Sequence, residues 1–315
     1  MRVLVTGVAG FIGSSIARAE LARGNDVVGI DCFIDYYPRP IKERNLAALK
    51  PRKGFRFVEA SLVDTDLAAL LDGVGAVYHQ AAQAGVRASW GRDFEIYTVN
   101  NVQATQRLLE ACKGRDLRVV YASSSSVYGN TEHLPMKEDH PTAPVSPYGV
   151  TKLAGEHLAR LYWANFQVPT VSLRYFTVYG PGQRPDMAFH KLIKAMLLER
   201  EFSLYGDGDQ TRDFTFISDA VAANLAAADR GRPGAYYNIG GGARVTVNEV
   251  IAMLEAIVGK PAKIRNVESQ KGDVRHTYAD TSLAREEIGY RPTVPLREGL
   301  AAEVEYIRSV ILPLE

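Results

Sequence analysis

Thr6-Gly7-Val8-Ala9-Gly10-Phe11-Ile12-Gly13 follows an apolar run at Arg2–Thr6 and opens a helical pattern at Phe11–Arg23. Gly7 permits a tight turn, Gly10 lets backbone approach a pyrophosphate, and Gly13 lets the helix pack closely on the strand. The helix N-terminus offers unpaired N–H donors and a partial positive charge to phosphates. A three-glycine string alone is weak evidence, but its place between strand and helix predicts a dinucleotide-binding turn.

A carboxylate follows at the end of the second predicted strand, at Asp31. It can accept hydrogen bonds from both hydroxyls of an adenosine ribose and would repel a 2′-phosphate, which favours NAD over NADP. The plainer alternative is that Asp31 only caps a loop, and Arg39 and Lys42 lie nearby in the sequence.

Strand patterns alternate with helical patterns through the first half of the chain. This alternation predicts an α/β fold of the Rossmann type, a doubly wound parallel sheet that binds ligands beyond the carboxyl ends of its strands. The predicted strands are Arg2–Thr6, Val27–Asp31, Arg56–Glu59, Ala76–His79, Arg118–Ser123 and Thr170–Tyr175, and the helices between them are Phe11–Arg23, Thr98–Cys112 and Pro147–Asn165.

The regular alternation of strand and helix patterns ends after Tyr175, where glycine-rich turns separate shorter elements. We expect residues 1–175 to form the NAD-binding domain, with 213–240 returning to it, and residues 176–212 and 241–315 to form a smaller α/β lobe for the substrate. The elements predicted there are strands at Asp213–Ile217 and Ala235–Asn238 and helices at Ala188–Leu198, Val247–Val258 and Leu296–Val310.

Composition narrows the possible partners. Among 315 residues, 37 lysines and arginines nearly balance 36 acidic residues, so no charged tract recommends nucleic acid or a membrane surface. Cys32 and Cys112 lie far apart without metal-type spacing, so we expect no metal and a reducing compartment. The absence of a leader pattern and of any long apolar run predicts a cytoplasmic protein.

Three polar residues form a candidate catalytic group. Ser146-Pro147 starts a helix that presents Tyr148 and Lys152 on one face, four residues apart. A tyrosine titrates near pH ~10, but a nearby ammonium and a positive nicotinamide favour its phenolate, which can then accept a proton from a sugar hydroxyl. The spacing alone is common by chance. Ser124, at the end of the fifth strand, adds a hydroxyl that can hold the reacting oxygen.

Taken together, these residues resemble the extended short-chain dehydrogenase/reductase family, specifically its NAD-dependent nucleotide-sugar epimerases and dehydratases. The resemblance runs along nearly the whole chain. It implies tightly held NAD, a transient keto sugar, and a homodimer built through helices 98–112 and 147–165. The motifs that carry it are Thr6–Gly13, Asp31, His79–Ala82, Asn101, Ser123–Tyr128, Tyr148 with Lys152, Arg174–Thr177, Arg212–Phe214 and Gly272–Val274.

The resemblance also implies roles for single residues, with Tyr148 as base, Lys152 as its partner and Ser124 as the hydroxyl group beside them. Ser61 stands where an aspartate commonly meets the adenine, and Gln270 replaces an arginine found at the diphosphate in many relatives. The expected cofactor contacts are Gly7, Gly10, Phe11, Ile12, Asp31, Ser61, Leu62, Gln80, Ala81, Ala82, Asn101, Tyr148, Lys152 and Tyr175. The expected substrate contacts are Arg87, Ser125, Ser126, Thr177, Arg184, Ala188, Phe189, Tyr205, Arg212, Gln270 and Asp273.

The tripeptide Ser124-Ser125-Ser126 bears on the reaction. Sugar 4,6-dehydratases have an acid at this place, and the decarboxylases that make UDP-xylose have a glutamate at the position of Ser126, whereas this chain has no carboxylate there. Elimination is therefore disfavoured, and epimerisation at C4 is expected. Asp31–Tyr37 and Phe176–Ala188 resemble UDP-glucuronate 4-epimerases, and Ser125, Ser126, Thr177 and Arg184 could hold a C5 carboxylate.

Five alternatives stay open at this point. The substrate could be UDP-glucose and UDP-galactose, or it could be a 2-acetamido sugar, which the small Thr277 does not exclude by size. A UDP-glucuronate decarboxylase, a reductase that releases its cofactor, and a non-catalytic NAD-binding protein are further readings. The last is disfavoured because Ser124, Tyr148 and Lys152 are all present.

Overall fold

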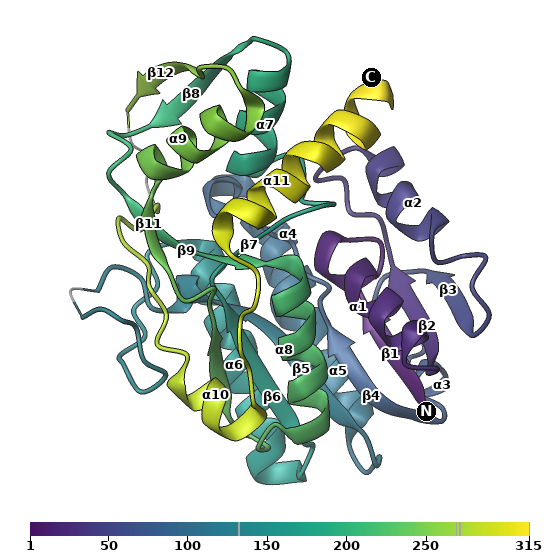
Figure 1. The fold of residues 1–315 in the computed structure, drawn as a ribbon. Coiled ribbons are helices and arrows are strands. Elements are labelled where there is room, and N and C mark those ends of the chain that lie inside the picture. Colours follow the sequence, from purple (N-terminus) through teal and green to yellow (C-terminus); the bar gives the residue numbers. More distant parts are fainter. Residues whose placement is uncertain (132, 269, 271, 315) are drawn as a thin grey trace.

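A parallel sheet of seven strands forms the centre of the molecule (Figure 1). The computed structural model describes residues 1–131, 133–268, 270 and 272–314, apart from the side chain of residue 314. All neighbouring strands of the sheet pair in parallel. Their order across it is β10 (Tyr236–Ile239), β6 (Thr170–Tyr175), β5 (Arg118–Ser124), β4 (Val74–His79), β1 (Arg2–Thr6), β2 (Asp26–Asp31) and β3 (Phe55–Glu59). The predicted α/β fold is confirmed.

Helices cover both faces of this sheet, because its strands are apolar on both sides. On one face, α1 (Phe11–Ala22) and α8 (Ile217–Arg230) pack beside α10 (Ser282–Ile288) over a core that includes Val5, Val120 and Val171. On the other face lie α3 (Leu67–Leu70), α5 (Ala104–Cys112) and α6 (Pro147–Phe166). Helix α2 (Arg39–Ala47) follows β2 beside α1 (Figure 1).

Helix α6 begins where the sequence predicted. Ser146 is its N-cap, and its hydroxyl accepts a hydrogen bond of 3.1 Å from the backbone N–H of Gly149, while Pro147 takes the first helical position. The predicted helix 98–112 is less regular. It comprises α4 (Phe94–Tyr97), a π-helical segment at Thr98–Gln103 and then α5. Such wide turns are frequent at functional sites.

The second half of the chain builds a smaller lobe with its own core. It contains a three-stranded sheet and a parallel two-stranded sheet, packed against three helices around residues such as Leu192, Leu254 and Leu300. The elements are β7 (Thr177–Tyr179), β9 (Thr211–Phe216) and β11 (Arg244–Thr246), then β8 (Glu201–Tyr205) and β12 (Lys263–Val267), and the helices α7 (Ala188–Leu197), α9 (Val247–Val258) and α11 (Leu296–Tyr306).

The return of residues 213–240 to the main sheet holds for β10 and α8 but is wrong for β9. Strand β9 pairs with β7 and β11 in the lobe, and only the helix after it brings the chain back to β6. An apolar run indicates a strand but does not choose its partner. The boundary between a cofactor domain and a substrate lobe stays a prediction.

No helix in the described ranges is both long and apolar enough to cross a bilayer. Helix α11 is followed by a π-helical turn at Ile307–Ile311.

Glu303 of α11 is 1 % exposed, and one of its carboxyl oxygens accepts a hydrogen bond of 2.9 Å from the backbone N–H of Gly180. The other oxygen has no partner among the described residues. Burial raises the pKa of Glu303 to about 8.

We expect Glu303→Gln to stabilise the fold at pH 8 more than at pH 5. The folded protein keeps the carboxyl protonated up to about pH 8, whereas the unfolded chain ionises from its ordinary value upward, so the free energy of unfolding of the parent falls between these limits. The amide cannot ionise and still accepts from Gly180. Chemical denaturation at both pH values measures the difference. An equal effect of the substitution at pH 5 and pH 8 would contradict it.

Candidate active site

The glycine turn after β1 is packed so tightly that side chains are excluded. Gly7 has φ +66°, and a Cβ there would lie 2.8 Å from the backbone N of Ala81. A Cβ on Gly13 would lie 2.2 Å from the carbonyl oxygen of Gly7, inside van der Waals contact. Gly10 is the N-cap of α1 and supplies no side-chain cap, so the first N–H groups of that helix keep their hydrogen-bonding capacity for a phosphate.

Asp31 lies beside this turn at the end of β2. One of its carboxyl oxygens accepts a hydrogen bond of 3.0 Å from the N–H of Ala9, and the other accepts one of 2.8 Å from the N–H of Phe33. Burial raises the pKa of Asp31, and these two N–H donors oppose that effect. Each oxygen still has a lone pair, so the carboxylate can also receive two hydroxyl groups. This geometry fits the ribose of a dinucleotide.

A single cavity of about 650 Å³ joins the glycine turn to the carboxyl ends of β4, β5 and β6. Its wall also includes Asp186 of the lobe. The structure brings together most of the residues predicted for the site: Gly7, Gly10, Phe11, Ile12, Asp31, Ser61, Leu62, Gln80, Ala81, Ala82, Arg87, Ser124, Ser125, Ser126, Tyr148, Lys152, Tyr175, Thr177, Arg184, Ala188 and Asp273.

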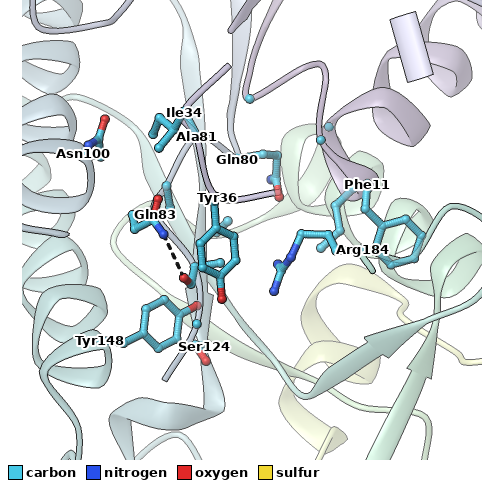
Figure 2. Close-up of a pocket in the computed structure, with 18 of the residues that line it drawn as sticks. Phe11, Ile34, Tyr36, Gln80, Ala81, Gln83, Asn100, Ser124, Tyr148 and Arg184 are labelled. Atoms are coloured by element: carbon cyan, nitrogen blue, oxygen red, sulfur yellow. Dashed lines mark hydrogen bonds between the residues drawn. The ribbon is translucent and has the colours of Figure 1, made fainter. Parts of the chain in front are cut away.

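Ser124, Tyr148 and Lys152 all line this cavity. Figure 2 shows Ser124 and Tyr148 close together, one from the end of β5 and the other from the first turn of α6. The hydroxyl of Ser124 accepts from the N–H of Ser126 and contacts the Ser126 hydroxyl, both at 3.1 Å. The ammonium of Lys152 donates to the carbonyl of Ala122 at 2.9 Å, which ties α6 to β5.

The electrostatics of the phenol differ from the sequence-based expectation that Lys152 makes it acidic. Burial raises the pKa of Tyr148, and the groups that pull it down are the charge of Arg184 and the hydrogen bond with Ser124. The Lys152 ammonium lies 5.9 Å from the centroid of the Tyr148 ring, and burial lowers its own pKa to about 7. Without bound cofactor, Arg184 therefore lowers the pKa of Tyr148 more than Lys152 does.

Arg184 has partners that the sequence did not indicate. Its Nε and Nη2 donate to the two carboxyl oxygens of Asp186 at 2.9 and 3.0 Å, and the hydroxyl of Tyr36 donates to Asp186 at 3.3 Å. Figure 2 shows Arg184 and Tyr36 pointing toward the Tyr148 side of the cavity. Asp186 was missed because nothing in the Gly180–Ala188 loop distinguishes a pocket carboxylate from an exposed one.

Two predicted contact residues lie outside the cavity wall and are held by other partners. Asn101 is 1 % exposed and lies behind the cavity, where it bonds the backbone of Gln83 and the hydroxyl of Thr151. Phe189 is packed in the core of the lobe, with its ring centroid 4.5 Å from that of Phe214. Asn101 therefore orders the loop before Ala84, and Phe189 supports the lobe.

Three more predicted residues lie outside the cavity wall but around Arg87 and Asp273, which form an ion pair of 2.7 Å. The Arg87 guanidinium lies 4.0 Å from the centroid of the Tyr205 ring. Arg212 donates to the carbonyls of Thr211 and Arg275, and the carbonyl of Gln270 accepts from the N–H of Asp273. Their contacts with a substrate stay predictions.

Asn224 of α8 is a further residue that sequence analysis missed. It is fully buried, and its side-chain oxygen accepts from Tyr175 at 2.9 Å and from Gln80 at 3.0 Å. It thus fixes two side chains of the cavity wall from behind. Within the part of the chain that the structure describes, no group of three or more acidic, histidine or cysteine side chains could hold a metal ion.

Comparisons with known proteins agree with this geometry. Residues 3–240 match the NAD dependent epimerase/dehydratase family. A solved structure of UDP-glucuronic acid 4-epimerase from Bacillus cereus, in complex with UDP-glucuronic acid and NAD, is 47 % identical with a TM-score of 0.96, over 98 % of this chain and 100 % of that one. An uncharacterized UDP-glucose epimerase of Bacillus subtilis is 45 % identical over 98 % of this chain and 99 % of the relative. A UDP-glucuronate 4-epimerase of Thermodesulfobacterium geofontis is 36 % identical over 98 % and 96 %.

We expect Asp31→Asn to lower the affinity for NAD by roughly tenfold or more, because the amide places N–H groups against the N–H donors of Ala9 or Phe33 and gives up an acceptor for the ribose. The NAD content of the purified protein after gel filtration measures this loss. Asp26→Asn, at the start of the same strand and away from the cavity, is the matched control. Equal NAD retention by both variants would show that Asp31 does not hold the cofactor.

Proposed function

We propose that this chain, which belongs to the NAD dependent epimerase/dehydratase family, interconverts UDP-glucuronic acid and UDP-galacturonic acid by epimerisation at C4. The observation that carries the proposal is one cavity in which a dinucleotide-binding turn faces Tyr148 and Ser124, with no acid at Ser124–Ser126 to drive elimination. The similarity to proteins named UDP-glucuronate 4-epimerases supports it.

The residues around the glycine turn fit NAD. The first turn of α1 would hold the pyrophosphate, and Asp31 would accept hydrogen bonds from the hydroxyls of the adenosine ribose. Ser61, Leu62, Lys152 and Tyr175 line the same cavity, where the first two would contact the adenine and the last two the nicotinamide ring. When bound, NAD supplies a hydride acceptor and donor next to C4 of the sugar.

Tyr148 accepts and later returns the proton of the sugar hydroxyl. Its phenol oxygen accepts the proton of the 4-hydroxyl, and the Ser124 hydroxyl holds the reacting oxygen within hydrogen-bond reach of that phenol. Charge in this buried place is costly, so the Arg184 guanidinium and the hydrogen bond with Ser124 offset the cost of forming a phenolate, and the Lys152 ammonium lies 5.9 Å from the centroid of the ring. The same phenol returns its proton after the sugar has turned over, and no net redox change results.

The 4-keto form of a glucuronate is a β-keto acid, which loses carbon dioxide when the carboxylate bond aligns with the carbonyl π-system. Ser125, Ser126, Thr177 and Arg184 line the same cavity as Tyr148. Charge-assisted bonds from these donors are about twice as strong as neutral ones and fix the carboxylate in an orientation that disfavours its loss. Arg212 and Asp273 would meanwhile hold the diphosphate and the ribose, so that the sugar end alone turns.

The chain is further proposed to form a homodimer through helices 98–112 and 147–165. Val150 and Leu161 lie three turns apart on α6 and are 49 % and 56 % exposed, and Ile96 beside this helix pair is 42 % exposed. Large exposed apolar side chains on neighbouring helices favour burial against a partner. The cytoplasmic location expected from the sequence stays a prediction.

Incubation of the purified protein with UDP-glucuronic acid and, separately, with UDP-glucose tests the activity. Proton NMR of the products is expected to show UDP-galacturonic acid without added NAD. The UDP-glucose alternative is kept because the Bacillus subtilis relative bears that name. Conversion of UDP-glucose and not of UDP-glucuronic acid would reverse the substrate assignment.

We expect Arg184→Met to lower kcat/KM for UDP-glucuronic acid by about tenfold or more and to release a UDP-pentose as a side product, because the carboxylate loses its cationic partner. Chromatography of the reaction mixture separates the two products. Arg200→Met, which removes one exposed positive charge at the end of α7, is the control. An unchanged rate with no pentose would exclude this role for Arg184.

Leu161→Glu is expected to give a monomer, because a two-fold interface would bring two buried carboxylates together. Light scattering after gel filtration measures the mass in solution. Ala47→Glu places the same charge on α2, far from the proposed interface, and should leave the dimer intact. A Leu161→Glu protein with the mass of the parent would contradict the proposed dimer.

A further inference from the structure

Arg184 and Asp186 form a side-on ion pair inside the cavity rather than on the surface. Their side chains are 24 % and 27 % exposed, and both line the cavity that contains Tyr148. The pair uses Nε and Nη2 of the guanidinium, at 2.9 and 3.0 Å from the two carboxyl oxygens. Within the described ranges, no acceptor takes a hydrogen bond from Nη1, so one edge of the guanidinium is left for another carboxylate.

Asp186 is held independently of Arg184. The hydroxyl of Tyr36 donates to it at 3.3 Å, and the same hydroxyl packs closely on Gly85, 2.1 Å from the place that a Cβ on this glycine would take. Burial raises the pKa of Tyr36 to about 12, so it stays a donor. Burial also opposes ionisation of Asp186, but Arg184 outweighs it and holds the pKa of this carboxyl low. Asp186 is therefore a carboxylate with a fixed place.

The proposed reaction sets a requirement that one fixed ion pair cannot meet. The carboxylate of the sugar must be held while C4 loses its hydride, and it must then be released, because the keto sugar turns over before hydride returns. A guanidinium with no other partner in a half-buried site binds a carboxylate tightly and slows that release. A guanidinium already neutralised by Asp186 binds it less tightly.

We propose that Asp186 is a specificity-determining positioning residue. Its carboxylate competes with the carboxylate of the substrate for the Arg184 guanidinium. This proposal rests on the proposed epimerisation of a uronic acid. With the sugar in place, Arg184 bridges the two carboxylates through its two edges. While the sugar turns, Arg184 pairs with Asp186 alone, and the hydrogen bond from Tyr36 keeps Asp186 close to the guanidinium. Asp186 thereby sets the affinity of the pocket for a charged sugar and the rate at which the sugar carboxylate is released from Arg184.

The exchange predicts opposite changes in binding and turnover for Asp186→Asn, which keeps the shape and removes the competing charge. The dissociation constant for UDP-glucuronic acid falls roughly fivefold, while kcat falls roughly tenfold, since the release before turnover becomes slower. The steady-state absorbance of reduced nicotinamide rises, because the keto form of the sugar persists. The dissociation constant for UDP-glucose, which has no carboxylate, does not change. Calorimetry and stopped-flow absorbance measure these quantities.

Asp35→Asn is the matched control, because it removes one exposed carboxylate from the loop that carries Tyr36 without touching Arg184. If Asp186 has only a structural role, Asp186→Asn weakens the binding of both sugars, and this result overturns the proposal. A fivefold fall in the dissociation constant for UDP-glucuronic acid in Asp35→Asn as well would also overturn it. The activity of the parent protein is measured first. If it converts only UDP-glucose, the proposed function falls and the exchange with it. If it converts UDP-glucuronic acid and Asp186→Asn weakens its binding, the exchange alone is overturned.

Discussion

The site depends on the competition between burial and charge at the Tyr148 phenol. Burial raises its pKa, whereas the Arg184 guanidinium and the Ser124 hydroxyl oppose that effect. The two cations near the phenol come from different parts of the chain, Lys152 from its own helix and Arg184 from the loop after β7. The chemistry therefore requires the sheet, the helix and the lobe to be held in register.

The scaffold provides that register through buried polar contacts. Arg174 of β6 and Glu156 of α6 form an ion pair of 2.8 Å with almost no exposure, and the Ser123 hydroxyl donates to the same carboxylate at 2.6 Å. Lys152 reaches Ala122 on β5. Losing one partner of such a group leaves a buried charge or donor unsatisfied, which costs more than the bond itself contributes. These contacts fix the end of β5, and so Ser124, against the first turn of α6.

Local patterns in the sequence were enough for the parts of the site that are built locally. The glycine turn, Asp31, the Ser146 cap and the Tyr148–Lys152 spacing each depend on residues close in the chain, and the structure places them together. The sequence did not reveal that Asp186 and Tyr36 meet at Arg184, that Asn224 supports Gln80, or that β9 pairs within the lobe. Those contacts join residues far apart in the chain, and their partners are chosen by tertiary packing, which neither periodicity nor residue type encodes. Asn101 and Phe189 were expected at the site from the family resemblance, and the structure packs both outside the cavity wall, a placement that no local pattern indicates.

Replacement of Tyr148 by phenylalanine tests whether the phenol accepts the proton of the sugar hydroxyl. The substitution removes one oxygen atom and keeps the ring that packs on Tyr97, with centroids 6.3 Å apart. We expect the variant protein to retain NAD and to bind UDP-glucuronic acid, while its rate of interconversion falls by at least about a hundredfold. An unchanged rate in that protein would contradict the assignment of the phenol as the proton acceptor.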